Sequence, residues 1–393
     1  MKCSLMVSSL IDPHISQPKL GKDKLGYSQG KTGYCWLVSA LHCVSEWLYQ
    51  KKGEVIRFSK GHLIYYDKIE KANKFLSQVI AHIQEPVDTQ VNSYIFSNSM
   101  TDRGQWEMAA NLIKKYGLMP ENCYSDPFDQ TSTTELNAAI SYILCSYGAE
   151  MRRRFAAERN MEDVVAIKKE AAQSVFNLLS AYLETPQKYF EVEIRGKPYT
   201  LTAPKYFRSY VAFPFNHYMS IYADDTVLPT RYSIQLDGNI KDMPLNTFYS
   251  VPDNIFSLCV NEQIQSEKFC WCSIDAGKFY VKSHHILDDS IFDLSLLTKK
   301  TLPQFNRSEV LKNHIASMSH AVVIMENLQN GFSIYDPSFS AENGAKCFMS
   351  DSWFQKYVFQ AIVQKSIVKP YNKVWATEVS MPWEFFGVSC SRL

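Results

Sequence analysis

Apolar residues recur at steps of three and four positions through much of the first half of the chain, and this period predicts amphipathic helices. The first such stretch follows a loop-like start over residues 1 to 34 and spans about 35 to 50, where Leu37 and Leu41 share one face. The same period returns over 62 to 84. We therefore expect two substantial helices early in the chain.

Two further helical segments follow, each with a signal for a boundary. Thr101 and Asp102 can cap a helix that stops at Gly117, because short polar side chains accept hydrogen bonds from the N–H groups of a first turn. From about 133 to 186 the pattern is again helical, and we expect an interruption near Gly148.

After about residue 205 the pattern changes to runs of β-branched and aromatic residues that end at glycine, asparagine or proline, which is typical of strands. These runs cover residues 232–238, 269–277, 321–325 and 331–337. We expect a mainly helical block over 55–205 and a β-rich lobe over 206–380. Because no repeat or linker divides the chain, residues 1–393 are expected to form one composite α+β domain.

The charge balance narrows the classes of partner. Lys and Arg total 41 against 40 Asp and Glu, a net charge of +1, so no global field attracts nucleic acid or acidic membranes. No apolar run approaches the roughly 20 residues of a membrane span, and the start MKCSLMVSSLIDPH lacks the apolar core of a signal peptide. The ten cysteines are therefore expected to be mostly reduced thiols in a cytoplasmic setting.

One cysteine stands at a chemically favourable position. Cys35 lies where the first predicted helix begins, and the N–H groups and dipole of a helix N-terminus favour a thiolate. Gln29 lies on the preceding glycine-rich loop, which can fold back to set its amide beside the backbone N–H of Cys35. Two such donors would form an oxyanion hole for acyl transfer. The alternative is that Cys35 is a core-facing thiol and Gln29 a solvated loop residue.

A thiolate nucleophile needs a basic partner, and His320 is the best placed of nine histidines. It begins an apolar strand, and the return strand reaches Asp336. A hairpin centred on Leu328 would set His320 and Asp336 directly opposite, with Cβ atoms about 5 Å apart, so that the carboxylate could orient the ring. A tight Asn-Gly turn would instead set Asp336 opposite Met325. A further alternative is a buried histidine bonded only to backbone.

Several sequence blocks resemble one enzyme family. QGKTGYCW resembles the Gln-x-x-x-Gly-x-Cys-Trp signature of papain-like cysteine peptidases, and SHAVVI resembles their His-Ala strand. The two are farther apart here than the roughly 130 to 150 positions of the simple members, which implies a large insertion. The blocks YYDKIEKANKFL, TDRGQWEMAANLIKKYGLMPENCY, SMSHAVVI and MPWEFFG, in order between about 27 and 387, resemble the bleomycin hydrolase and aminopeptidase C branch.

The resemblance implies a papain-like two-lobed fold, with a helical lobe, a β-barrel-like lobe and large helical insertions, assembled as a homohexamer. It implies an aminopeptidase that acts on peptides with a free N-terminus and needs no metal or cofactor, with its C-terminal tail, here 381–393, in the substrate cleft. Cys35 matches the nucleophile, Gln29 the oxyanion-hole residue and His320 the general base and acid. Asp336 stands where the family has asparagine.

Two departures from the family pattern affect the expected activity. Aspartate at 336 can hold an imidazole as asparagine does, and its charge should favour imidazolium, so we expect activity with a shifted pH optimum. Phe339 stands where the family has a shielding tryptophan. The tail ends VSCSRL, which is longer than the family's usual ending and bears on strict aminopeptidase specificity.

Other features have weaker functional interpretations. The terminal SRL resembles a peroxisomal address, whereas a tail held in the active site could not be read by a receptor. The basic cluster at 151–155 is expected to be a solvated helix face or a salt-bridged subunit contact rather than a nucleic-acid site. Cys270 and Cys272, with His284 and His285, are too few and poorly spaced for zinc, and the two cysteines should pack in the core.

The sequence thus predicts a cysteine aminopeptidase that uses Cys35, His320, Asp336 and Gln29. One alternative is a catalytically weakened relative that serves as a binding or assembly scaffold, which the altered Asp-Pro-Ser-Phe stretch suggests. Another is an acyl-transferring or deamidating cysteine enzyme on the same fold.

Overall fold

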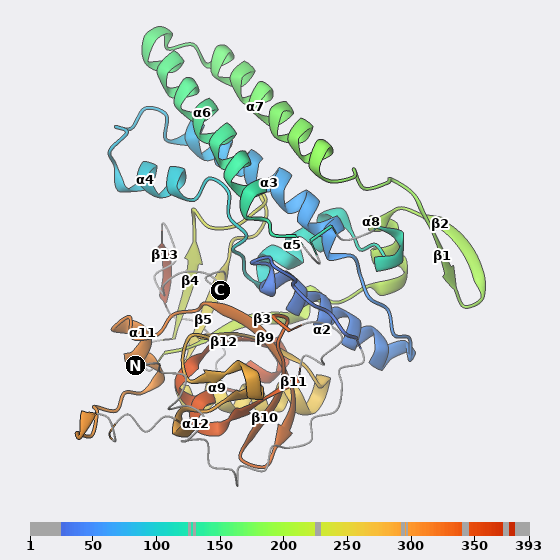
Figure 1. Ribbon diagram of the computed structural model, residues 1–393, viewed down its shortest axis with the longest axis vertical. Helices are drawn as coiled ribbons and strands as arrows, with labels where there is room; N and C mark the ends of the chain where they lie inside the picture. The colour runs from blue at the N-terminus through green and yellow to red at the C-terminus, as the bar shows by residue number, and fades with distance from the viewer. Residues whose placement is uncertain are drawn as a thin grey trace.

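Most of the long helices and the main sheet occupy separate parts of the molecule in the computed structural model (Figure 1). The structure describes residues 25–124, 127–128, 131–224, 229–291, 295, 298–339, 346–371 and 377–381. The C-terminal tail from 382, with most of the MPWEFFG block and the terminal SRL, lies outside the described residues, as do Cys3 and Cys390.

The helical part is built mainly from long helices. These are α2 (Cys35–Lys52), α3 (Lys60–Ala81), α4 (Gln90–Ser97), α5 (Trp106–Tyr116), α6 (Thr134–Glu158), α7 (Met161–Tyr182) and the short α8 (Ala203–Tyr206). The predictions of helices over 35–50 and 62–84 are confirmed to within a few residues at each end. In Figure 1, α6 and α7 form a long pair at the end of the molecule away from the sheet.

Two predicted helix boundaries are wrong. The cap of α5 is Gln105, and Asp102 is instead drawn into a buried ion pair described below. The break between α6 and α7 falls at Arg159, in the left-handed region, and not at Gly148. Gly148 lies inside α6, where an added Cβ would come within 3.2 Å of the Phe96 ring. This glycine therefore permits close helix packing and does not end the helix.

Eleven of the described strands form one sheet, in the order β13-β4-β5-β3-β12-β6-β9-β10-β11-β8-β7. Their bounds are β3 (Tyr218–Ala223), β4 (Thr230–Ile234), β5 (Thr247–Val251), β6 (Cys270–Ile274), β7 (Tyr280–Val281), β8 (Ile286–Leu287), β9 (His320–Leu328), β10 (Gly331–Tyr335), β11 (Lys346–Ser350), β12 (Val358–Gln364) and β13 (Thr377–Met381). A separate hairpin joins β1 (Phe190–Ile194) and β2 (Lys197–Leu201). The α+β class is confirmed, with a sheet whose described strands form an open order and not a closed barrel.

Shorter helices pack around the sheet. They are α9 (Asp253–Glu267), α11 (Arg307–Lys312), α12 (Asp351–Tyr357) and α13 (Lys365–Val368). Elsewhere the longer elements are joined by the single turns η1 (Glu121–Cys123), η3 (Phe215–His217), η4 (Lys282–His284) and η5 (Asp289–Ile291) and by the wider turn η2 (Phe207–Val211). No helix among the described residues has the length and apolar character that crossing a membrane requires.

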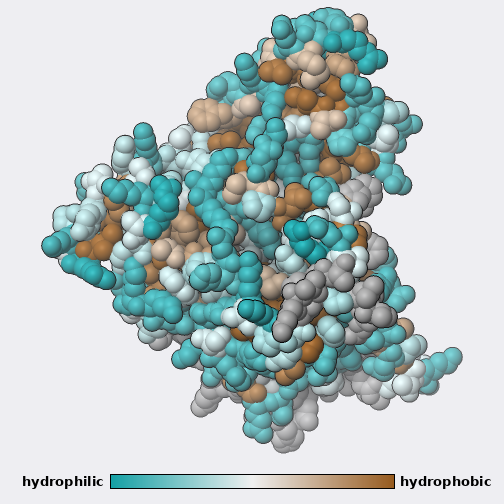
Figure 2. Space-filling model, turned by 180° about the vertical axis from the view of Figure 1, so that it is seen from behind, coloured by the Kyte–Doolittle hydropathy of each residue, from teal (hydrophilic) through white to brown (hydrophobic). Residues whose placement is uncertain are grey.

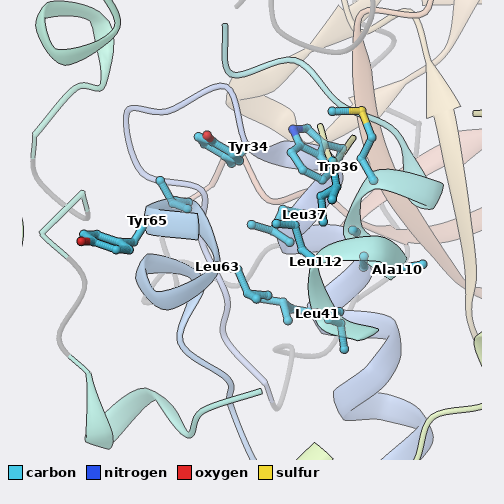
Figure 3. Close-up of a cluster of buried hydrophobic side chains, with 14 of the residues drawn as sticks. Tyr34, Trp36, Leu37, Leu41, Leu63, Tyr65, Ala110 and Leu112 are labelled. Carbon is cyan, nitrogen blue, oxygen red and sulfur yellow. The ribbon is translucent and has the colours of Figure 1, made fainter. Parts of the chain in front are cut away.

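Strand β9 separates two hydrophobic cores because its side chains alternate between faces. Ala321 and Val323 pack into the core that contains α2, while Val322 and Ile324 pack into the core on the other face, with α9 and α12. Helix α2 is buried on nearly all sides, as its almost uninterrupted apolar sequence requires. Figure 3 shows Trp36 and the leucines of α2 packed against α3 and α5. The first turn of α2 is thereby fixed in the middle of the molecule.

Candidate active site

Cys35 is the first residue of α2, as the sequence predicts, and its side chain is buried. The preceding Tyr34 is the N-cap, and the first turn of this 18-residue helix contains no acidic residue. The positive end of the helix dipole therefore acts on the thiol without a competing carboxylate in that turn. A helix N-terminus of this kind stabilises negative charge, whereas burial of the side chain acts in the opposite direction.

The loop before Cys35 is held in one conformation by paired hydrogen bonds. The Gln29 side-chain Nε2 donates to the Thr32 carbonyl at 2.7 Å, and the Thr32 hydroxyl donates back to the Gln29 carbonyl at 2.7 Å. Gly30 turns the chain with a φ of 61°, a conformation that favours glycine. The Gln29 side-chain amide is buried, and one of its two Nε2 hydrogens is engaged by Thr32.

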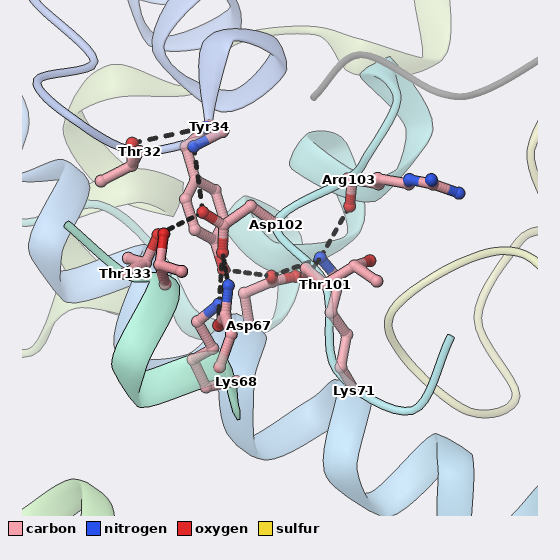
Figure 4. Close-up of polar contacts among 12 residues, drawn as sticks. Thr32, Tyr34, Asp67, Lys68, Lys71, Thr101, Asp102, Arg103 and Thr133 are labelled. Atoms are coloured by element: carbon pink, nitrogen blue, oxygen red, sulfur yellow. Dashed lines mark hydrogen bonds and ion pairs between the residues drawn. The ribbon is translucent and has the colours of Figure 1, made fainter. Parts of the chain in front are cut away.

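A buried ionic network fixes the same loop from the other side (Figure 4). The Asp102 carboxylate accepts the backbone N–H of Gly33 at 2.9 Å. It also accepts Lys68 Nζ at 2.5 Å, Asn137 Nδ2 at 2.8 Å and the Thr133 hydroxyl. Burial alone would raise the pKa of Asp102, but Lys68 and these hydrogen bonds outweigh it and hold the pKa below its usual range. Asp102 is therefore an ionised anchor for Gly33, which lies two residues before Cys35.

The sequence prediction missed this network, although one signal for it was present. Lys68 lies three residues after Tyr65 and four before Ala72, so it falls on the predicted buried face of α3. A lysine on a buried face requires an anionic partner. The identity of that partner, Asp102, depends on a contact between segments 34 positions apart in the chain.

His320 and Asp336 are in direct contact. The His320 Nε2 and the Asp336 Oδ1 are 2.7 Å apart, and both side chains are almost fully buried. The backbone N–H of Ser338 donates to the same oxygen at 2.8 Å, and the Tyr280 hydroxyl donates to Oδ2 at 2.6 Å. Burial would raise the pKa of Asp336, but the charge and hydrogen bond of His320, with the other two donors, lower it well below its ordinary value. The carboxylate is therefore held ionised against the ring.

The contact forms through a different strand register from the one predicted. Leu328 pairs with Gly331, and after a shift between Ser333 and Ile334 the pairing reaches Val323 with Tyr335. Continuing that register sets Asp336 opposite Val322, so both the directly opposed arrangement and the Met325 alternative are wrong. The bulge moves the pairing by one position, and Asp336 then meets His320 as a diagonal neighbour on the same face, which an imidazole can reach.

Two contacts fix the direction in which α2 runs along β9. The Ser39 hydroxyl donates to the Ala321 carbonyl at 3.0 Å. Three residues further along the helix, the His42 ring stacks on Tyr335 with centroids 4.0 Å apart, and Tyr335 is the partner of Val323. Helix and strand therefore advance in the same sense, from the His320 end of β9 toward its middle.

This direction brings the candidate residues to one end of the sheet. Cys35 lies one turn before Ser39, on the same side of α2, and so lies toward the start of β9, where His320 is. Gln29 is held there too, because its backbone N–H donates to the carbonyl of Pro337 at 2.8 Å, directly after Asp336. Gln29, His320 and Asp336 thus lie together, and Cys35 begins the helix that packs beside the same strand.

The remaining sequence features have structural explanations. Cys270 and Cys272 are fully buried in β6, which confirms the prediction that they pack in the core. Within the described ranges, no group of three or more His, Cys, Asp or Glu side chains could hold a metal ion. In the basic cluster, Arg153 and Arg154 form ion pairs with glutamates of their own helix, and Arg152 donates to the His82 and Glu85 carbonyls. Two of the three arginines are therefore ion-paired within their own helix, and the third is bonded to backbone carbonyls.

Comparison with known proteins agrees with this geometry. The chain belongs to the Peptidase C1-like family, whose model matches residues 11–383. It is similar to Aminopeptidase C of Lactobacillus delbrueckii subsp. lactis, with 25% identity over 92% of this chain and 85% of that protein. It is also similar to Bleomycin hydrolase of Gallus gallus, with 24% identity over 87% of this chain and 80% of that protein.

A solved structure shows the same fold. The crystal structure of PepW from Lactobacillus rhamnosis HN001 aligns with a TM-score of 0.84 at 21% sequence identity, covering 98% of this chain and 91% of that one. The fold is therefore the papain-like one, and the predicted resemblance to the bleomycin hydrolase and aminopeptidase C branch is confirmed. Family and fold together make this chain an enzyme of the cysteine peptidase class.

Proposed function

We propose that the chain is a cysteine aminopeptidase with a Cys35-His320-Asp336 site in which Gln29 supplies part of the oxyanion hole. The observation that carries this proposal is the buried His320–Asp336 contact at the end of the sheet toward which the N-terminus of α2 points. The His320 Nε2 is engaged by Asp336, so Nδ1 is the ring nitrogen left to exchange a proton with a thiol.

In the proposed reaction, the Cys35 thiol first gives its proton to His320 Nδ1. The thiolate attacks the carbonyl carbon of the first peptide bond, a C–S bond forms, and the carbonyl electrons move to oxygen. The second Nε2 hydrogen of Gln29 and the Cys35 N–H stabilise that oxyanion. The C–N bond then breaks as His320 protonates the leaving amine. Water, deprotonated by His320, hydrolyses the thioester, which releases the N-terminal residue and restores the thiol.

The aspartate at 336 should change the pH dependence of this reaction. A carboxylate stabilises imidazolium more than an amide does, because it adds a full negative charge beside the ring. We expect Asp336→Asn to move the basic limb of the kcat/KM profile to lower pH while much of the activity remains. A profile that does not move would show that the contact has no catalytic role.

We propose that the substrates are peptides with a free N-terminus, in keeping with the names of the curated relatives. The last residues of the chain are proposed to limit the cleft to such substrates. Removing residues 388–393 should then yield longer products from mixed peptides, as judged by mass spectrometry. Unchanged product lengths would exclude a gating tail.

A direct test labels the thiols with iodoacetamide at mildly acidic pH and maps them by mass spectrometry. We expect Cys35 to react first, because a thiolate–imidazolium pair remains reactive where ordinary thiols are protonated. Cys123 is a good internal control, since it is more exposed than Cys35 and burial raises its pKa. Cys35→Ala should abolish hydrolysis of peptides, and Cys123→Ala should not. Uniform slow labelling without hydrolysis would favour the scaffold alternative.

The same proposal includes a homo-oligomer, for which the hexamer is the expected form, working in the cytoplasm. Hydrophobic side chains gather near the top of Figure 2, in the region of the α6–α7 pair. On α7, Met161, Val165 and Phe176 are each more than 40% exposed, and such patches are typical of association surfaces. Sedimentation velocity should give a species several times the chain mass, and a monomer at micromolar concentration would contradict this part.

A further inference from the structure

The carboxylate of Asp336 receives a side-chain hydrogen bond from a residue outside the four candidate residues. Tyr280, the first residue of β7, donates its hydroxyl to Asp336 Oδ2 at 2.6 Å. The other oxygen, Oδ1, is shared by His320 and the Ser338 N–H. Among the residues that the structure describes, the donor to Oδ2 is Tyr280. The two oxygens of Asp336 therefore have different partners, with His320 on one and Tyr280 on the other.

The phenol is well suited to remain a donor. Burial first, and then the nearby Asp336 charge, raise the pKa of Tyr280 well above its ordinary value, so the hydroxyl keeps its proton wherever the enzyme works. Cys347 Sγ lies 3.3 Å from the same hydroxyl oxygen, and burial raises the pKa of that thiol as well. Cys347 is therefore neutral, and the phenol proton has the Asp336 carboxylate as its strongest acceptor.

We propose that Tyr280 is a positioning residue that suits this site to aspartate instead of asparagine. This inference rests on the proposed function above. A buried carboxylate with one unbonded oxygen can rotate away from the ring or take up a proton, and each change would weaken its hold on His320. The Tyr280 hydroxyl prevents both by bonding Oδ2.

The pairing is specific to the carboxylate. An asparagine amide in the same place would direct its N–H₂ group at the phenol, and two donors would then face each other. The hydroxyl would have to turn, accept a hydrogen bond from the amide and donate its own hydrogen bond to Cys347 Sγ, which is a weak acceptor. Tyr280 and Asp336 thus act as a matched pair, and the removal of one should alter what the other contributes.

A double-mutant cycle tests this coupling. The kcat/KM–pH profile is measured for the native chain, Tyr280→Phe, Asp336→Asn and the double variant. In Tyr280→Phe we expect kcat/KM to fall about tenfold, the effect of a hydrogen bond to a charged group. The basic limb should move to lower pH, because a carboxylate that is free to rotate or to take up a proton holds the imidazolium proton less strongly. In the Asp336→Asn background the same change should alter kcat/KM by less than about twofold and leave the limb in place.

The control is Tyr371→Phe. Tyr371 also donates to a carboxylate, at 2.7 Å, but it is exposed, and its partner Glu262 lies on α9. It should leave the profile unchanged. Thermal melting of each variant establishes that it is folded, and a Tyr280→Phe chain that is folded and active with the native profile overturns the inference. Equal effects in the two backgrounds would also overturn it, because they would indicate packing alone.

A second readout separates this inference from the proposed function. The rate of Cys35 alkylation against pH reports the thiolate–imidazolium pair without any peptide substrate. A native chain that hydrolyses no peptide, but whose Cys35 titration shifts in Tyr280→Phe, would refute the peptidase and support the positioning role. An active enzyme with superimposable titrations would refute the positioning role alone. A flat titration in the native chain would refute both.

Discussion

The buried ion pair between Lys68 and Asp102 gives the clearest prediction about stability. Lys68→Met removes the charge but keeps a flexible side chain of similar length. The Lys68 side chain is 0% exposed and that of Asp102 is 8% exposed, so the mutation leaves an uncompensated carboxylate in the interior. Breaking a buried pair in this way costs about 3–5 kcal/mol. We expect a loss of that size in the free energy of unfolding.

The assay is urea denaturation at neutral pH, followed by tryptophan fluorescence and by circular dichroism. Arg57→Met is the matched control, because Arg57 pairs with Glu121 at the same 2.5 Å but the two side chains are 43% and 36% exposed. An exposed pair is worth about 0–1 kcal/mol. The Lys68 variant should also slow alkylation of Cys35, since Asp102 positions the loop through Gly33. If the two variants lose similar stability, then burial of the Lys68 pair has no energetic consequence and the reasoning is refuted.

Two further predictions concern pH and packing. Burial lowers the pKa of His62 to about 4, so over this range the unfolded chain binds a proton that the folded chain does not. The free energy of unfolding should therefore fall by up to about 3 kcal/mol as the pH drops from about 6.5 to 4. His62→Gln should flatten that decline in urea midpoints measured across this range, whereas substitution of an exposed histidine, His217→Gln, should not. An added Cβ at Gly104 would lie 2.3 Å from the Trp36 ring, so Gly104→Ala should lower the melting temperature strongly. Gly53→Ala is the control, because an added Cβ there meets no atom within 4 Å and the substitution costs only about 1–2 kcal/mol for the left-handed backbone. Equal melting temperatures for the two alanine variants would contradict the overlap with Trp36.

The local pattern of the sequence was sufficient for most elements. Helices α2 and α3 and strands β6, β9 and β10 lie where apolar period and residue type predict them, since each depends on which face of a short segment is buried. The position of Cys35 at a helix start was predictable for the same reason. The Asp336 contact was expected as well, although through a different pairing.

Tertiary structure decided what local pattern cannot encode. The bulge at Met325 in β9 changes the register, so His320 meets Asp336 diagonally, and a one-residue shift of this kind depends on how the whole sheet packs. Asp102 became an ionised partner of Lys68 and Gly33, and not a helix cap, because folding brought a buried lysine to it. Tyr280 reaches Asp336 from a two-residue strand that no periodicity reveals. The sequence by itself therefore determined which residues could carry the chemistry, and the fold determined their partners, because a partner is set by distance in space and not by spacing along the chain.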